Sequence, residues 1–313
     1  MTAPVAPALL VTGVPRSGTT WVANVLRRAE GALYIHEPDT ENVEPYALEA
    51  KRTLGRYPAL LPGDEAPAYE SLWLRALQGN KRERTFGQRA AKRLLREASE
   101  SEVRHAYLPG GRPSLRLRAA RRLAVPPSDR HAASLVIVKS VFSALALEWI
   151  EDRFTPRVLV VRRNLLNVLA SWIDLAYEPV GIGRDPRVRE AFVEPLGMPP
   201  PPSDRSALAE TSWEVALLDR VLAAQAERHP EWLVVSHDDL CIDPRAAFQD
   251  LYGRLGLAWS PQADRFIEDS NAEGRGYSLK RVTRDQPESW RSRLNDKQVE
   301  EIRSVLAGFS HST

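Results

Sequence analysis

An apolar run that leads directly into a glycine-rich turn constrains the fold of this chain more than any other feature. Leu9–Val14 is mostly aliphatic and overlaps the turn Gly13–Thr20, which has two glycines five residues apart and ends in hydroxyl residues. That spacing is typical of a P-loop, in which a buried strand passes through a turn into a helix. The backbone N–H groups of such a turn, with the helix N-terminus, form an anion-binding site. The sequence therefore predicts a phosphate-binding loop after the first strand.

The rest of the chain repeats the order of strand and helix. Further short aliphatic runs are Leu33–Ile35, Leu135–Val138, Val158–Val161 and Trp232–Val235. The expected helices are Thr19 to Arg28, Phe142–Glu151, Asn164–Leu175, Ala207–Glu227, Pro244–Leu255 and a last one that Asn295 or Asp296 caps. This alternation is typical of an α/β fold, here a P-loop-like parallel sheet of about five strands flanked by helices.

Two segments depart from the alternation. Residues 40–130 are helical in pattern and basic, and residues 178–206 have the pattern of a long loop. Neither resembles an independent domain boundary. We therefore expect a single domain over residues 1–313, with a helical basic insertion at about 40–130.

The composition excludes several classes of protein. The apolar runs are far shorter than the ~20 residues that span a bilayer, and no basic-then-apolar leader opens the chain. The only cysteine, Cys241, excludes a disulfide framework and a cysteine-rich zinc site. We therefore expect a cytoplasmic protein with no transmembrane segment and no metal, and the sequence indicates no particular oligomeric state.

Positive charge is concentrated in one part of the chain. Between Lys81 and Arg122 there are thirteen Lys/Arg and four Glu, a local net charge of +9, whereas the whole chain carries +2. Such a block attracts an anionic substrate, a membrane or nucleic acid, or it forms a solvated helical face. Only Phe86 and Tyr107 are interleaved as aromatics, which favours the solvated face and argues against nucleic acid.

The glycine-rich loop lacks the lysine that Mg-nucleotide chemistry requires. Thr19 occupies the Walker-lysine position, and the cation of the loop is Arg16 instead. The nearest candidate for a Walker-B aspartate, Asp238, follows a strand at the wrong end of the chain order. A P-loop NTP-dependent kinase or switch protein is therefore the alternative rather than the leading interpretation.

Two sequence motifs, one in the glycine-rich loop and one after a later strand, indicate a resemblance to a different family. Val14–Trp21 resembles the 5′-phosphosulfate loop of sulfotransferases that use 3′-phosphoadenosine 5′-phosphosulfate (PAPS). Arg163, followed eight residues later by Ser171, resembles the 3′-phosphate motif of that family. Ile137–Ser140 and His237–Pro244 are similar to two further family segments, so the resemblance covers both halves of the expected sheet but not the basic insertion.

The resemblance implies a PAPS site with 3′,5′-ADP as the product. Arg16 would hold the bridging and phosphate oxygens, and Arg163 and Ser171 would bind the 3′-phosphate. The 5′-phosphate would be bound by Ser17, Gly18, Thr19 and Thr20. Trp21 would stack on the adenine, and packing in the core is an equal alternative for it.

Two parts of the nucleotide assignment stay open. Arg162 competes with its neighbour Arg163, although the eight-residue spacing favours Arg163. The family also closes the 3′-phosphate site with a basic, glycine-containing segment near the C-terminus, whose usual Arg-Lys-Gly is absent here. The candidates for it are Arg275, Lys280, Arg281 and Arg284.

The general base differs from that of the cytosolic aryl and steroid members. Their histidine comes two residues after the strand-end lysine, which is Lys139 here, and this position is Val141. The chain is instead similar to tyrosylprotein and Golgi carbohydrate sulfotransferases, which pair a loop arginine with a downstream glutamate. Glu37 lies 21 residues after Arg16, at the end of an expected strand. His36 is the competing base, but neighbouring strand residues point to opposite faces. A solvated loop carboxylate is the alternative role for Glu37.

These observations lead to one expected reaction. The chain would move a sulfuryl group in-line from PAPS to a hydroxyl of a carbohydrate or glycosylated small molecule, with Glu37 as base and Lys139 stabilising the sulfuryl oxygens. The arginine-rich composition indicates a bacterial enzyme, and the basic insertion would suit an anionic glycan or glycolipid as acceptor. The alternatives are the NTP-dependent kinase, a phenolic or tyrosine acceptor, and a PAPS-binding protein without catalysis.

Overall fold

The structure is a computed structural model that describes residues 6–81, 86–107, 111–202, 206–274, 276 and 278–309. Its contacts divide the chain into two compact units. Unit 1 comprises Met1–Val11 and Gly31–Val158, and unit 2 comprises Thr12–Glu30 and Leu159–Thr313. The expectation that both belong to one domain stays a prediction.

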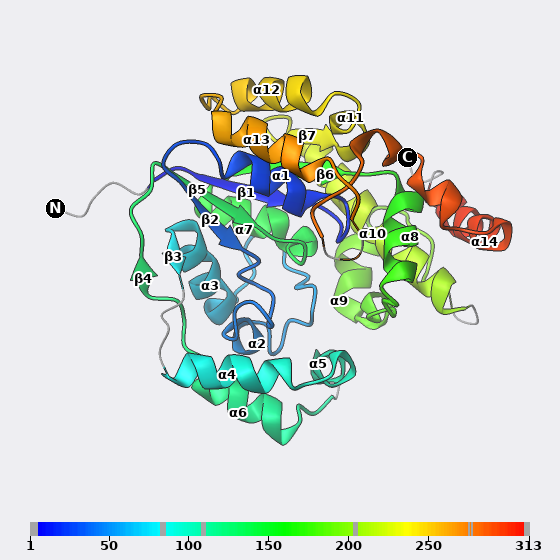
Figure 1. Ribbon diagram of the computed structural model, residues 1–313. Coiled ribbons are helices and arrows are strands. Elements are labelled where there is room, and N and C mark those ends of the chain that lie inside the picture. Colours follow the sequence, from blue (N-terminus) through cyan, green and yellow to red (C-terminus); the bar gives the residue numbers. More distant parts are fainter. Residues whose placement is uncertain are drawn as a thin grey trace. The chain divides into compact units, whose positions relative to one another are not determined.

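The expected parallel sheet of five strands is present, which confirms the α/β fold class (Figure 1). Its order is β2-β5-β1-β6-β7. The strands are β1 (Ala8–Thr12), β2 (Ala32–His36), β5 (Leu135–Lys139), β6 (Arg157–Arg162) and β7 (Leu233–Ser236). β5 is buried along its whole length, which explains why it has the sequence of a continuous apolar run.

In unit 1 the register brings three strand ends to one edge. Lys139 at the end of β5 pairs with His36 on β2 and with Val11 on β1. The backbone N–H of Glu37 donates to the carbonyl of Lys139 at 2.7 Å, and the N–H of Ser140 donates to the carbonyl of Val11 at 3.0 Å. The residues that follow β2 and β5 are therefore held next to one another.

In unit 2, each strand leads directly into a helix. β6 and β7 are parallel, with Arg162 opposite Ser236. After β6, the Asn164 side chain accepts a hydrogen bond from Leu166 N and caps α8 (Leu165–Asp174). The side chain of Ser236 caps α11 (His237–Leu240) in the same way. α1 (Thr19–Leu26) begins directly after the glycine-rich loop.

The basic stretch in unit 1 is mainly helical. Its helices are α2 (Ala47–Ala50), α3 (Pro67–Leu77), α4 (Phe86–Arg96), α5 (Glu100–Tyr107) and α6 (Leu115–Leu123). Two short antiparallel strands, β3 (Asn80–Lys81) and β4 (Asp129–Arg130), pair with each other. The other helices of this unit are the 3₁₀-helix Ala144–Ala146 and α7 (Leu147–Phe154).

The expectation that residues 178–206 form a long loop is wrong in part. It contains a 3₁₀-helix (Ile182–Arg184), α9 (Pro186–Val188) and a π-helical turn (Arg189–Val193). The physical reason lies far along the chain, because the buried carboxylate of Glu214 accepts hydrogen bonds from three successive backbone N–H groups, those of residues 180–182. A local pattern of prolines and glycines does not reveal that contact.

The remaining helices of unit 2 are α10 (Ala207–Arg228), α12 (Pro244–Arg254), α13 (Pro261–Ser270) and α14 (Asp296–Ala307), with short 3₁₀ turns at Thr283–Asp285 and Ser289–Ser292. Asn295, rather than Asp296, is the N-cap of α14 and forms a capping box with Gln298. Across the described ranges, no helix has the length and apolar character needed to cross a membrane.

Candidate functional site

The glycine-rich loop of unit 2 is closely packed on both of its glycines. A Cβ added to Gly13 would lie 2.4 Å from the carbonyl oxygen of Val161, and one added to Gly18 would lie 2.1 Å from the ring of His237. Gly18 also has a φ of 95°. Arg16 has a φ of 76°, a left-handed conformation that is uncommon for a residue with a side chain. The backbone of the loop is therefore held in a specific, partly strained form.

The loop has the features of an anion site. Gly18 is the N-cap of α1 and supplies no side-chain cap, and the first N–H groups of a helix have no partners within it. Ser17 Oγ is buried and has no hydrogen-bond partner in the part of the chain that the structure describes. An anion at this position would satisfy both the helix N-terminus and the orphaned hydroxyl.

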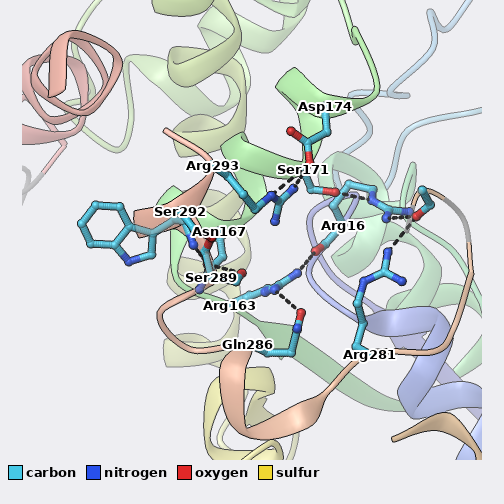
Figure 2. Close-up of polar contacts among 12 residues, drawn as sticks. Arg16, Arg163, Asn167, Ser171, Asp174, Arg281, Gln286, Ser289, Ser292 and Arg293 are labelled. Carbon is cyan, nitrogen blue, oxygen red and sulfur yellow. Dashed lines mark hydrogen bonds and ion pairs between the residues drawn. The ribbon is translucent and has the colours of Figure 1, made fainter. Parts of the chain in front are cut away.

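Arg16 and Ser171, predicted from two separate signatures, are in direct contact (Figure 2). Arg16 Nε donates to Ser171 Oγ at 2.9 Å, and Arg16 Nη2 donates to the carbonyl of Gly276 at 2.9 Å. Ser171 is buried on α8, two turns after the helix begins. The structure thus brings the glycine-rich loop and the α8 motif into one cluster.

Arg163 joins the same cluster. Its Nη1 donates to the carbonyl of Arg16 at 3.2 Å and its Nη2 to Gln286 Oε1 at 3.2 Å. Its Nε is buried and, among the described residues, has no partner. Burial lowers the pKa of Arg163 to about 10, although the carboxylate of Asp238 acts in the opposite direction. A partly buried cation with one buried, unpaired donor atom fits an anionic group bound beside it.

Arg162 makes a different set of contacts. Its Nε and Nη2 donate to the two carboxylate oxygens of Asp219 at 3.1 and 2.6 Å. This charge-assisted pairing raises the pKa of Arg162. Of the two neighbours, the one beside Arg16 is therefore Arg163.

Of the C-terminal candidates, Arg281 lies in the cluster. Its Nη2 donates at 2.9 Å to the carbonyl of Gly276, the same group that accepts from Arg16. Burial, followed by the positive charges of Arg16 and Arg293, lowers the pKa of Arg281. Within the part of the chain that the structure describes, four arginines contribute to the positive potential here, namely Arg16, Arg163, Arg281 and Arg293.

The other C-terminal candidates are not brought into the cluster. Lys280 is exposed, and in the described ranges its side chain makes no recorded contact with the arginines. Arg284 is exposed and lies 3.5 Å from a carboxylate oxygen of its neighbour Asp285. Arg275 lies outside the described residues. The predicted role of Lys280 therefore has no contact to support it.

Sequence reasoning missed the residues that hold the C-terminal segment in place. Asn167, fully buried on α8, donates to the carbonyl of Pro287 at 2.8 Å and accepts from Ser289 Oγ and Trp290 N, both at 2.9 Å. Gln286, which bonds Arg163, belongs to the segment that Asn167 anchors. The sequence contained one signal for Asn167, because it lies four residues before Ser171 and therefore shares a helix face with it. Nothing in the local sequence around Gln286 indicated its role.

Trp21 packs inside unit 2. Its Nε1 donates to Ser270 Oγ at 3.0 Å, and its ring meets Phe248 edge-on at 4.9 Å between centroids. The side chain is 7% exposed. These contacts favour the packing alternative, and adenine stacking stays a prediction.

The other predicted catalytic residues belong to unit 1, where Glu37 and Lys139 form an ion pair. Lys139 Nζ donates to Glu37 Oε1, and Thr40 Oγ1 donates to Glu37 Oε2 at 3.1 Å. Lys139 is buried, whereas Glu37 keeps 16% of its side chain exposed. Glu37, like Arg16, has a left-handed backbone, with a φ of 43°.

The surroundings of Glu37 keep it ionised. Burial by itself would raise the pKa of Glu37, but the charges of Lys139 and His36 and the hydrogen bonds from Lys139 and Thr40 more than offset it, so that the pKa is lowered. At neutral pH the side chain is thus a carboxylate that can accept a proton. His36 is exposed, and its Nδ1 shares a 2.8 Å hydrogen bond with the hydroxyl of Tyr34, two residues earlier on the same strand face.

A second carboxylate of unit 1, Asp39, is fully buried. Ser140 Oγ lies 2.8 Å from each of its oxygens, and the hydroxyl of Tyr69 donates at 3.4 Å. Burial raises the pKa of Asp39 to about 6, although Lys51 and Ser140 act in the opposite direction. The folded protein therefore holds this proton more tightly than the unfolded chain does.

This raised pKa predicts how stability changes with pH. The contribution of Asp39 to the free energy of unfolding is fully present below about pH 4 and is lost as the pH rises through about 6. The Asp39→Asn variant lacks this titrating carboxyl group, so it does not lose this stability as the pH rises. Its free energy of unfolding, relative to that of the wild type, should therefore increase by about 2–3 kcal/mol from pH 4 to pH 7. Urea unfolding of both proteins over this range measures the change. A difference that stays constant with pH would contradict the prediction.

Comparisons with known proteins add three findings. A family model described as the sulfotransferase family matches residues 7–261. The search of curated proteins finds no match.

Similar solved structures include the sulfotransferase domain from the curacin biosynthetic pathway, with a TM-score of 0.46 and 12% identity, covering 97% of this chain and 99% of that chain. A sulfotransferase from Mycobacterium avium has a TM-score of 0.44 and 14% identity, covering 99% and 78%. Retinol dehydratase in complex with androsterone and inactive cofactor PAP has a TM-score of 0.38 and 14% identity, covering 99% and 82%.

Proposed function

The chain belongs to the sulfotransferase family, and on this premise we propose that it moves a sulfuryl group from PAPS to a hydroxyl of a carbohydrate or glycosylated small molecule. One observation carries the donor part of the proposal. Arg16 of the glycine-rich loop contacts both Ser171 and Arg163 of the α8 motif, in a cluster with two orphaned buried polar atoms. A nucleotide with phosphates at both its 5′ and 3′ positions has the charges that such a cluster would bind.

Each residue of the cluster has a distinct task in the proposal. The loop amides and Ser17 Oγ bind the 5′-phosphate, and the free Nε of Arg163 binds the 3′-phosphate together with Ser171. Arg16 would exchange its hydrogen bond to Ser171 for contacts of its forked donors with the bridging oxygen. Because a sulfuryl group carries less charge than a phosphoryl group, these fixed cations take the place of Mg²⁺.

On the acceptor side, Glu37 is the proposed base. PAPS, when bound, supplies the electrophilic sulfur and a leaving group, 3′,5′-ADP. Glu37 accepts the proton of the acceptor hydroxyl while the new oxygen–sulfur bond forms and the bond from sulfur to the bridging oxygen breaks. The proton would end on the carboxylate, and the electron pair would stay on the oxygen that leaves with 3′,5′-ADP.

The ion pair between Glu37 and Lys139 makes the basicity of Glu37 depend on where the ammonium group of Lys139 lies. Lys139 lowers the pKa of Glu37 in the structure described here, which makes Glu37 a weak base. If Lys139 donated instead to the sulfuryl oxygens of a bound donor, Glu37 would lose its counter-charge, and its pKa would rise toward the range in which general bases work well. The lysine thus serves both the sulfuryl oxygens and the base.

Ligand-induced stabilisation tests the donor assignment. We expect 3′,5′-ADP without Mg²⁺ to raise the melting temperature by several degrees, since a ligand at a hundredfold excess over its Kd contributes about 2.7 kcal/mol. 5′-AMP, which lacks the 3′-phosphate, should give a much smaller shift, and ATP with Mg²⁺ is the second comparison. Stabilisation by Mg-ATP but not by 3′,5′-ADP would favour the NTP-dependent alternative and overturn the proposal.

The acceptor class requires a separate experiment. Radiolabelled PAPS offered with glycans, glycolipids and phenols in parallel reports which class receives the label. The proposal expects transfer to a sugar hydroxyl, in line with a glutamate rather than a histidine as the base. Transfer to phenols alone would overturn the carbohydrate assignment but leave the donor assignment intact.

A further inference from the structure

The basic stretch of unit 1 contains a helical hairpin, α4 and α6, that presents one face to solvent. The helices run in opposite directions, because Gly87 at the start of α4 lies next to the carbonyl of Leu123 at the end of α6. At the other end, Arg116 near the start of α6 donates to the carbonyl of Glu97, just past α4. The hairpin is thus a compact pair with an inner and an outer side.

The inner side is already occupied. Buried apolar residues of the hairpin pack together with α2 and α5 in one cluster, formed by Leu48, Leu95, Val103, Leu117 and Ala120. These hairpin residues recur at helical spacing, so the opposite side of each helix is turned away from the cluster. The outer side is the part of the hairpin left for a partner.

Arginines dominate that outer side. Arg89, Arg93 and Arg96 follow one face of α4, and Arg118 and Arg122 follow one face of α6, and all five are exposed. Arg93 pairs with Glu97 at 3.1 Å, but the other four have no carboxylate partner among the described residues. By contrast, Arg121, which lies toward the inner side, is neutralised by Glu49 at 3.0 Å.

Exposed apolar side chains accompany these arginines. At the end where α4 begins and α6 finishes, Phe86 is 80%, Val125 47% and Leu123 39% exposed. The three residues belong to one end, because Gly87 adjoins Leu123 and the side chain of Gln88 donates to the carbonyl of Val125 at 3.2 Å. At the other end Leu115 is 75% exposed.

We propose that the outer face of α4 and α6 docks onto an anionic lipid bilayer. The unpaired arginines would contact acidic headgroups, and Phe86 with its apolar neighbours would enter the interfacial region, as in peripheral amphipathic helices. A soluble anionic glycan would use the arginines but leave Phe86 in water, so the combination of charge and apolar exposure favours the bilayer. Docking is independent of the proposed reaction, because it involves no residue of the nucleotide cluster or of the Glu37 pair.

Vesicle sedimentation tests the proposal with the full chain. Wild-type protein is mixed with phosphatidylcholine vesicles with and without phosphatidylglycerol, at low and moderate salt. Two variants separate charge from apolar contact, Arg118→Glu with Arg122→Glu, and Phe86→Ser. The matched control, Arg189→Glu with Arg265→Glu, makes the same change in net charge at exposed positions of unit 2. Urea unfolding establishes that each variant is folded.

The expected pattern is specific. Wild type and control should bind only vesicles that contain phosphatidylglycerol, and salt should weaken this binding. The α6 double variant should bind roughly tenfold or more weakly, and Phe86→Ser several-fold more weakly. No binding of wild type to acidic vesicles would overturn the proposal. Equal losses of vesicle binding in the α6 variant and in the control would also overturn it. So would binding of the protein to heparin that Phe86→Ser leaves unchanged, because this would identify a soluble polyanion as the partner.

Discussion

Replacing Glu37 with glutamine should lower turnover by roughly 10²–10⁴-fold, the usual contribution of a general base. The substitution keeps the shape of the side chain and its ability to accept from Thr40, but removes the basicity. Steady-state rates with PAPS and the acceptor found in the label screen measure the effect. Binding of 3′,5′-ADP should hardly change, because none of the hydrogen bonds described for the nucleotide cluster involves Glu37.

Two comparisons make the result for Glu37 interpretable. His36→Gln, on the neighbouring and exposed position, should cost far less. Since glutamine leaves buried Lys139 without a counter-charge, Glu37→Asp is included as a variant that keeps the charge and should retain more activity. If His36→Gln were the more damaging change, His36 would be the base. If neither mattered, Glu37 would have to be withdrawn as the proton acceptor.

Arg163→Ala should weaken the binding of 3′,5′-ADP by roughly ten- to hundredfold, since a charge-assisted hydrogen bond to phosphate contributes about 1.5–3 kcal/mol. The side chain is partly buried, touches the backbone of Arg16, and has one donor without a partner in the described residues. Removing it therefore takes away a contact that no neighbouring group replaces. Titration calorimetry measures the change.

The matched control is the adjacent Arg162→Ala. This substitution breaks a bidentate pair with Asp219 on other elements of unit 2 and should leave the affinity for 3′,5′-ADP nearly unchanged. Unfolding curves for both variants separate lost binding from lost stability. Loss of affinity in Arg162→Ala alone would mean that the 3′-phosphate motif is out of register by one residue.

β1, β5 and β6 could be predicted from sequence because they are buried enough to have a continuous apolar pattern. The expected run Leu135–Val138 became β5, one residue longer, and the expected run Val158–Val161 became β6, one residue longer at each end. The helix expected over Asn164–Leu175 is α8, which begins one residue later with Asn164 as its N-cap. Several ends shift by a residue or two because hydrogen bonding, rather than hydropathy, decides where an element stops. The helix expected at Phe142–Glu151 differs more, because a 3₁₀-helix precedes α7, which begins only at Leu147.

The parts that could not be predicted depend on contacts between residues far apart in the chain. Gln286 reaches Arg163 across 123 residues, and Glu214 holds the backbone of residues 180–182 from a different helix. Short motifs carry no information about such partners. Motifs did indicate Arg16, Arg163 and Ser171, because their chemistry depends on spacing within a single loop or within one strand–helix unit.

The long separations within the nucleotide cluster also determine when it can form during synthesis. The loop arginine, Arg16, donates a hydrogen bond to a carbonyl 260 residues further along the chain, and Arg163 donates one to Gln286. Contacts of such high order close late in folding, because the entropy of a long loop must be overcome first. A nascent chain that has been synthesised only through α13 therefore has the glycine-rich loop but not the segment that closes it. We therefore expect nucleotide binding only after Gln286 has been synthesised.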